Sequence, residues 1–255
     1  MVLQLTRRDE FSVITLNRPD ALNALNDEMI DAIAAGIDEA ATSGARALLF
    51  VGAGAKAFCA GADIKGLLGR SVVEAKRFAE RGQRVFAKLD MLPIPSVAII
   101  NGYAFGGGLE LALACTFRIA TANAKMGLPE IKLGAIPGYG GTQRLPRVIG
   151  EARALEMIMT GRTVAADEAE RMGLVSRIVE GDAVEGGMAF ARAFTKFSLP
   201  VLALAREAVM RAGDTPINEG LKIEADLNTL AFQTEDVKEG MSAFIEKREA
   251  KFRDA

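Results

Sequence analysis

The chain contains no histidine among its 255 residues. This absence excludes Ser-His-Asp and Cys-His nucleophilic sites, together with every metal site that relies on imidazole ligands. If the protein is an enzyme that moves protons near neutral pH, the groups left for this work are carboxylates, lysines, tyrosines and cysteines. A carboxylate placed beside backbone N–H donors is therefore the leading idea for a catalytic site.

Other features are scarce as well. The two cysteines, Cys59 and Cys115, are too few for a disulfide framework or a four-thiolate metal site, and we expect no metal and no redox cofactor. The net charge of −2 provides no basic field for nucleic acid. No apolar run reaches the ~18 residues of a membrane span, and residues 1–10 lack the apolar core of a signal peptide. We expect a cytoplasmic protein, or an organelle-matrix protein whose transit peptide has been removed.

Hydrophobic periodicity divides the chain into two parts. The first ~125 residues mix strands and helices. Strands are predicted over 11–16, 47–51, 96–100 and 117–120, and helices are predicted to begin at Asn26 and at Ser71. Helices are predicted over 139–149, 151–160, 165–172, 183–197, 200–212, 216–231 and 234–246. With no internal repeat or obvious linker, this pattern predicts an α/β first part followed by a helical second part.

The segment 101–110 carries the strongest chemical signal, because Gly106, Gly107 and Gly108 are consecutive and precede an apolar helix. Glycines let a ligand approach the main chain closely, and a helix N-terminus presents free N–H donors and a partial positive charge. Glu110 follows two positions later and lies within reach of the same spot. The structural alternative is close packing of the helix, with Glu110 in a buried ion pair.

Three further segments have candidate roles. The segment 57–65 is rich in small residues and predicts either a ligand-contacting backbone or a tight strand-to-helix turn. Glu130 follows Pro129 in an apolar stretch, and is either a fixed functional carboxylate that faces Glu110 or a solvated surface group. The basic segment 244–248 is either a phosphate-binding patch or a solvated helix end.

Taken together, these motifs resemble those of the enoyl-CoA hydratase (crotonase) family over essentially the whole chain. Six segments carry the resemblance in the right order: 16–25, 57–65, 101–110, 127–143, 173–177 and 244–248. The resemblance implies a crotonase-like spiral of ββα units over 1–195 and a C-terminal helical trimerisation region over 196–255. It also implies a homo-oligomer, either a trimer or a dimer of trimers.

The resemblance further implies an acyl-CoA substrate, of which coenzyme A is a part, and no separate cofactor. Glu110 and Glu130 are the implied catalytic residues, and the N–H groups of Ala62 and Gly107 are the implied oxyanion hole. The implied residues for binding CoA and substrate are Ala24, Ala60, Asp63, Ile64, Lys65, Gly106, Gly138, Phe244 and Lys247. We expect the acyl tunnel to be lined by residues around 66–90 and 135–145.

The implied reaction is the addition of water across the 2,3 double bond of a 2-enoyl-CoA, which gives a 3-hydroxyacyl-CoA. One alternative is a Δ3,Δ2-enoyl-CoA isomerase or another thioester branch of the same fold. The presence of both glutamates weighs against that alternative. The second alternative is a non-catalytic member of the family that binds acyl-CoA or RNA, and the near-neutral net charge weighs against RNA.

Overall fold

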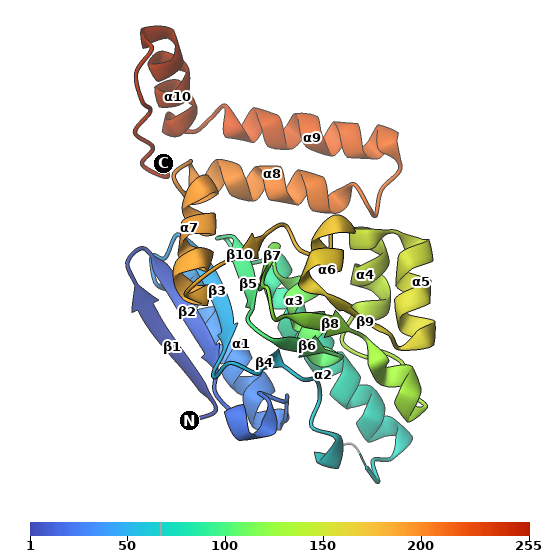
Figure 1. Cartoon of the computed structure of the whole chain (residues 1–255). Coiled ribbons are helices and arrows are strands. Elements are labelled where there is room, and N and C mark those ends of the chain that lie inside the picture. Colours follow the sequence, from blue (N-terminus) through green and yellow to red (C-terminus); the bar gives the residue numbers. More distant parts are fainter. Residues whose placement is uncertain (67) are drawn as a thin grey trace. The chain divides into compact units, whose positions relative to one another are not determined.

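The structure is a computed structural model that describes residues 1–66 and 68–255 (Figure 1). The side chain of Lys65 lies outside the described part. The chain divides into two compact units, residues 1–189 and 190–255. The boundary lies within a helix, α7 (Ala183–Thr195), and earlier in the chain than the predicted 195/196.

A six-stranded sheet forms the centre of the first unit. Its strands, in spatial order, are β1 (Leu3–Arg8), β2 (Phe11–Leu16), β3 (Ala47–Gly52), β5 (Ser96–Ile100), β7 (Phe117–Thr121) and β10 (Ile178–Val179). Only β1 runs antiparallel to its neighbour. Every residue of β3 and β5 is buried, because a parallel sheet in an α/β protein is covered on both faces. The four predicted strands are confirmed, whereas β1 and β10 were not predicted.

A second, smaller sheet runs alongside the first. It contains β4 (Ala57–Cys59), β6 (Tyr103–Phe105), β8 (Lys125–Gly127) and β9 (Thr163–Ala165), in that order. Strands of three residues are too short to show an alternating pattern, which explains why the sequence did not reveal them. The chain places one strand in each sheet and then forms a helix, as in β3–β4–α2 (Val72–Asp90) and β5–β6–α3 (Gly107–Ala114). The expected spiral of ββα units is confirmed.

The two early helices begin at the predicted caps. The Asn26 side chain accepts a hydrogen bond from the N–H of Met29 at 2.9 Å and begins α1 (Asp27–Thr42). Ser71 and Glu74 form the expected capping box at the start of α2. Both caps lie next to the pocket described below, so they fix the main chain at two points of its wall.

The predicted helices of the second part agree with the structure to within two residues at each end. They are α4 (Gly141–Ile149), α5 (Glu151–Thr160), α6 (Ala166–Arg171), α7, α8 (Leu199–Arg211), α9 (Ile217–Ala231) and α10 (Glu235–Glu246). Within the second unit, α8 and α9 pack side by side (Figure 1). Among the described residues, no single helix is long and apolar enough to span a membrane, although α7 and α8 as a bent pair meet the criteria of length and composition together.

The helix α3 is the most deeply buried helix of the first unit, since all eight of its residues are buried. It contacts β4, β5 and β7 and therefore lies between the two sheets. A Cβ atom added at Gly108 would lie 2.0 Å from the carbonyl oxygen of Cys59 on β4. Only glycine permits this contact between main chains, so the close-packing interpretation of the glycine run holds for Gly108.

Gly108→Ala should lower the free energy of unfolding by about 3 kcal/mol, because the added methyl group overpacks the contact with Cys59. Helix propensity alone predicts the opposite sign, a gain of about 1 kcal/mol. The matched control is Gly220→Ala in α9, where a Cβ meets no atom closer than 3.4 Å. Urea unfolding of both variants tests this, and a Gly108→Ala protein as stable as the control would contradict the packing argument.

Candidate active site

The N-terminus of α3 presents unpaired backbone donors. Gly106 has a φ of +51° and donates its N–H to the carbonyl of Gly127 at 3.0 Å. Gly107 is the first residue of α3, so its N–H has no partner within the helix. Within residues 1–66 and 68–255 we also find no other acceptor for it. The free N–H of Gly107 is therefore available to a ligand.

A second free donor comes from Ala62, which forms an isolated parallel bridge with Leu25. The hydrogen bonds of this bridge, both 2.8 Å long, use the carbonyl of Gly61 and the N–H of Asp63. The N–H of Ala62 faces the other way and has no acceptor in the described part of the chain. Two donors of this kind, if they converge, can stabilise an oxygen that gains negative charge.

The two segments that carry these donors are neighbours. Gly61 has a φ of +105°, and a Cβ atom there would lie 3.0 Å from the carbonyl of Phe105 and 3.7 Å from the nitrogen of Gly107. The sequence around 57–65 is thus both a short strand, β4, and a backbone that reaches the start of α3. The assignment of Ala62 and Gly107 to an oxyanion hole stays a prediction that this geometry supports.

Glu110 lies in the first turn of α3 and is only 2% exposed. Its Oε1 atom accepts hydrogen bonds from the backbone N–H groups of Tyr139 at 2.7 Å and Gly141 at 2.8 Å. Burial raises the pKa of Glu110 to about 7, the two N–H donors oppose this rise, and the charge of Glu130 adds to it. Backbone donors at the start of α4 hold the carboxylate, in place of the ion pair considered as the alternative.

Glu130 lies in a short 3-10 helix, η3 (Pro129–Leu133), that follows β8. Its Oε1 atom would lie 2.9 Å from a Cβ at Gly106, so the side chain contacts the loop that begins α3. Its Oε2 atom is buried and has no hydrogen-bond partner among the described residues. Burial raises the pKa of Glu130. Glu130 is therefore held against the start of α3 rather than fully solvated, and its charge is close enough to raise the pKa of Glu110.

The other predicted residues of the first unit lie around these donors. The carbonyl of Ala24 accepts a hydrogen bond from Arg18 at 2.6 Å, and the same arginine pairs with Asp63 at 3.1 Å. Ala60 donates its N–H to the carbonyl of Leu22, which ties the two loops together. The carbonyl of Gly138 accepts a hydrogen bond from Gln83 at 2.8 Å, and Ile64 is exposed. The prediction for the Lys65 side chain falls outside the described residues.

Two predicted residues belong to the second unit. Phe244 lies near the end of α10 and is 86% exposed. Lys247 is the C-cap of α10 and adopts a left-handed backbone conformation with a φ of +55°. Their assignment to CoA binding stays a prediction.

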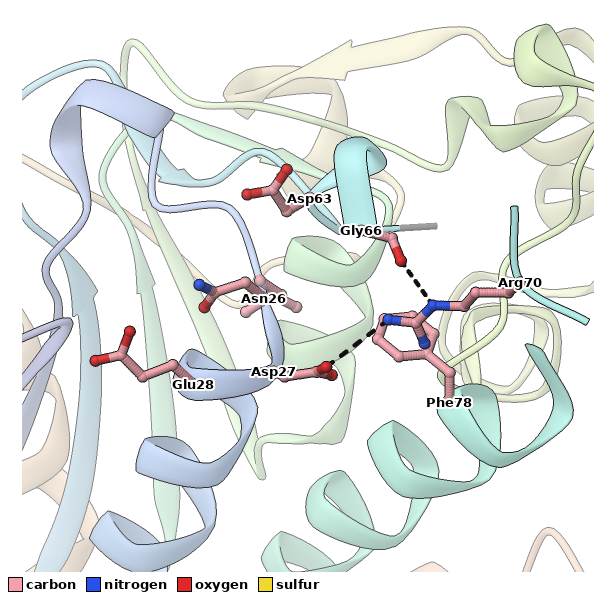
Figure 2. A pocket seen from close by; sticks show the side chains of 8 residues that line it. Asn26, Asp27, Glu28, Asp63, Gly66, Arg70 and Phe78 are labelled. Carbon is pink, nitrogen blue, oxygen red and sulfur yellow. Dashed lines mark hydrogen bonds and ion pairs between the residues drawn. The ribbon is translucent and has the colours of Figure 1, made fainter. Parts of the chain in front are cut away.

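A pocket of about 280 Å³ opens beside the two donor segments (Figure 2). It is lined by Leu25, Asn26, Asp27, Glu28, Asp63, Gly66, Arg70 and Phe78. Leu25 also contacts the oxyanion segment, since its Cδ1 atom would lie 3.0 Å from a Cβ at Gly107. Gly66, Arg70 and Phe78 fall within the expected tunnel segment 66–90, whereas the contribution of residues 25–28 was not predicted.

The contacts that Tyr139 makes with Glu110 and with two aromatic rings were not predicted from the sequence. Besides its N–H bond to Glu110, its buried ring packs against Phe78 at 5.4 Å and Phe86 at 5.6 Å between ring centroids. A Cβ atom at Gly107 would lie 3.2 Å from this ring. The glycine pair that follows Tyr139 was a visible signal for close approach of the main chain. Among the described residues, no group of three or more Cys, Asp or Glu side chains is arranged to hold a metal ion.

Comparisons with known proteins agree with this fold. The sequence profile of the enoyl-CoA hydratase/isomerase family matches residues 6–255. A crotonyl-CoA hydratase from Syntrophomonas wolfei is 42% identical over 254 residues, which cover 97% of this chain and 96% of that protein. A short-chain-enoyl-CoA hydratase from Clostridium acetobutylicum is 39% identical over 246 residues, with 96% and 94% covered. The crystal structure of an enoyl-CoA hydratase from Bacillus anthracis matches with a TM-score of 0.94 at 35% identity, with 100% of both chains covered.

The spiral of ββα units followed by helices thus defines a protein of the crotonase fold. The family profile covers nearly the whole chain, and the sequence identity to the full-length relatives is well above the level that unrelated proteins reach. The chain belongs to the enoyl-CoA hydratase/isomerase family.

The burial of Glu110 predicts a pH-dependent difference in stability between the wild type and Glu110→Gln. Because the folded-state pKa of Glu110 lies above its unfolded value, the wild type takes up a proton on folding and loses stability as the pH rises from about 4.5 to about 7. Gln cannot ionise, so the Gln variant does not lose stability in this way. Relative to the wild type, its free energy of unfolding should rise by up to about 3 kcal/mol between pH 4.5 and 8.

Urea unfolding at a series of pH values measures this difference. The control is Glu224→Gln on an exposed face of α9, which should track the wild type at every pH. If the difference in free energy of unfolding between the wild type and Glu110→Gln stays constant across the pH series, the carboxyl group of Glu110 has an ordinary pKa in the native state.

Proposed function

We propose that this protein is an enoyl-CoA hydratase that adds water across the 2,3 double bond of a 2-enoyl-CoA to give a 3-hydroxyacyl-CoA. One observation carries the proposal: the buried carboxylate of Glu110 and the half-buried carboxylate of Glu130, from separate elements, lie beside two unpaired backbone N–H groups. The names of the full-length relatives, among them a crotonyl-CoA hydratase, support the same activity.

The N–H groups of Ala62 and Gly107 receive the thioester oxygen in this mechanism. Attack of water at C3 pushes electrons toward that oxygen, so negative charge develops between the two donors. The donors are fixed before the reaction, and the N-terminus of α3 adds its partial positive charge. The loss of one such donor typically costs about 3 kcal/mol of transition-state stabilisation.

Glu110 and Glu130 hold the water and exchange its proton. One carboxylate takes a proton as the water oxygen bonds to C3, and the other, in its protonated form, supplies a proton to C2. The raised pKa of Glu110, about 7, means that both of its protonation states are populated near neutral pH. Two neighbouring carboxyl groups that share one proton are suited to this exchange.

We also propose that the protein forms a trimer or a dimer of trimers. The second unit exposes large apolar side chains along its helices: Val209, Ile217, Leu221, Leu230, Phe232, Met241, Phe244 and Ile245. A unit of this size does not usually leave so much apolar surface in water. In α5, the apolar residues Leu155 and Met159 are also exposed, whereas Met157 is fully buried and adds nothing to the apolar surface.

The assembly proposal predicts a solution mass of three or six times 27.1 kDa. Closed rings of identical subunits bury such a patch on every copy, which is why a multiple of three is expected to persist at micromolar concentration. Light scattering coupled to size exclusion measures this mass. A monomer at 27.1 kDa would contradict the proposal.

The hydratase mechanism predicts that neither glutamate is dispensable. Glu110→Gln and Glu130→Gln each keep the size of the side chain but cannot exchange a proton, so each should lower kcat for crotonyl-CoA by ~100-fold or more. The double variant should lose far less than the product of the two losses, because both groups act on one water. Loss of ultraviolet absorbance from the conjugated thioester measures the reaction.

The same four proteins distinguish a hydratase from an isomerase when they are assayed with a 3-enoyl-CoA. An isomerase moves one proton along the acyl chain and can work with one carboxylate. If the wild type isomerises much faster than it hydrates, the isomerase assignment replaces this one. A single Gln variant that hydrates at the wild-type rate would refute the two-glutamate mechanism.

A further inference from the structure

Arg70 carries unused hydrogen-bonding capacity in the pocket beside the oxyanion segments. Its guanidinium group has five N–H donors in a rigid planar fork. In the described part of the chain its one hydrogen bond runs from Nε to the carbonyl of Gly66, at 2.6 Å. The nearest carboxylate oxygen, on Asp27, lies 3.8 Å from Nη2 and is too distant for a hydrogen bond. Most of its donors therefore remain available.

The position of Arg70 is fixed before any ligand enters. Its guanidinium carbon lies 3.9 Å from the centroid of the Phe78 ring, which is a cation–π contact. The bond to Gly66 anchors the other side of the group (Figure 2). The side chain is 22% exposed, so a ligand group that meets it is partly shielded from water. A cation held in this way loses little entropy when it binds an anion.

Two carboxylates of the same pocket are held more closely by other arginines than by Arg70. Asp27 is bound at 2.9 Å by Arg81, which lies outside the pocket lining, and Asp63 is bound at 3.1 Å by Arg18. Glu28 points away from Arg70 (Figure 2). Asp27 remains an ion-pair partner of Arg70 at 3.8 Å, so a ligand carboxylate that forms direct hydrogen bonds to the guanidinium group competes with a longer and weaker contact.

The pocket connects Arg70 to the reaction centre. Its lining includes Leu25, which contacts Gly107, and Asp63, which follows Ala62. Phe78, the aromatic residue of the lining, packs against Tyr139, which holds its ring in place. An acyl chain that starts at the oxyanion donors and enters this cavity brings its far end toward Arg70.

We propose that Arg70 is a specificity-determining residue that selects 2-enoyl-CoA substrates whose acyl chain ends in a carboxylate. A carboxylate can accept two hydrogen bonds from the unused edge of the guanidinium group. An alkyl end would instead displace the water that is hydrogen-bonded to those N–H donors and would offer no acceptor in its place. This inference rests on the proposed hydratase function, because that function places the acyl chain in the pocket.

The test compares two thioesters of matched shape, pent-2-enedioyl-CoA and 5-methylhex-2-enoyl-CoA, which differ in a terminal carboxylate or isopropyl group. The wild type should show a kcat/KM at least tenfold higher for the carboxylate-ended substrate. Arg70→Met should reduce that ratio by about tenfold or more, the size expected for a charge-assisted hydrogen bond. Arg70→Lys keeps the charge but loses the planar fork, and should retain an intermediate ratio.

Two controls separate this effect from general damage. Arg77→Met changes an exposed arginine on α2 that does not line the pocket, and should leave the ratio unchanged. Crotonyl-CoA, whose chain is too short to present a polar end, should be hydrated by Arg77→Met at close to the wild-type rate, which shows that the control variant is folded and active. An equal ratio for wild type and Arg70→Met, or a wild-type preference for the isopropyl end, would overturn the proposal.

A binding experiment distinguishes failure of this inference from failure of the proposed function. Calorimetry with the saturated analogues, pentanedioyl-CoA and 5-methylhexanoyl-CoA, measures chain-end preference without turnover. If the protein hydrates no thioester but still binds the carboxylate-ended analogue more tightly through Arg70, the specificity assignment stands and the hydratase assignment falls. If the protein hydrates crotonyl-CoA but binds the two analogues equally well, the hydratase assignment stands and the specificity assignment falls.

Discussion

The contact between Gly108 and the carbonyl of Cys59 is the constraint on which the rest of the site depends. It brings the first turn of α3 against β4 at a distance that no side chain other than glycine permits. The free N–H of Gly107 consequently lies next to the loop that carries Ala62. A looser packing of α3 would move the N–H of Gly107 away from that loop, so the proposed oxyanion hole depends on this contact.

The same packing creates an electrostatic cost. Glu110 lies one turn into a helix that is apolar on every side, and burial makes its charge unfavourable. The fold offsets this cost chiefly with two backbone donors from the start of α4, while the charge of Arg144 contributes less and makes no direct hydrogen bond to Glu110. An arginine partner would lower the pKa of Glu110 and hold it ionised. Backbone donors leave the group able to gain and lose a proton near neutral pH, which acid–base chemistry requires.

The sequence predicted the long elements and the chemistry of the motifs, but not the contacts that complete the site. The strands β3 and β5 are short apolar runs, the helices after residue 140 have clear periodicity, and the caps at Asn26 and Ser71 are short-range signals. The three-residue strands of the small sheet have no period to detect. Arg70, just before α2, and Phe78, on α2, reach the pocket only through tertiary packing, so no local pattern distinguishes them from other residues of the expected tunnel segment 66–90. The resemblance supplied the oxyanion pair, because spacing alone does not bring Ala62 to Gly107.

Tyr139 separates two properties that are usually linked in an active site. Its main chain holds Glu110, and its side chain forms part of the wall beside Phe78 and Gly107. Any residue except proline supplies the same N–H donor. Mutation at this position during evolution can therefore change the packing beside Phe78 and Gly107 while the backbone donor to Glu110 stays in place, so that the surroundings of the carboxylate diversify among descendants without loss of its support.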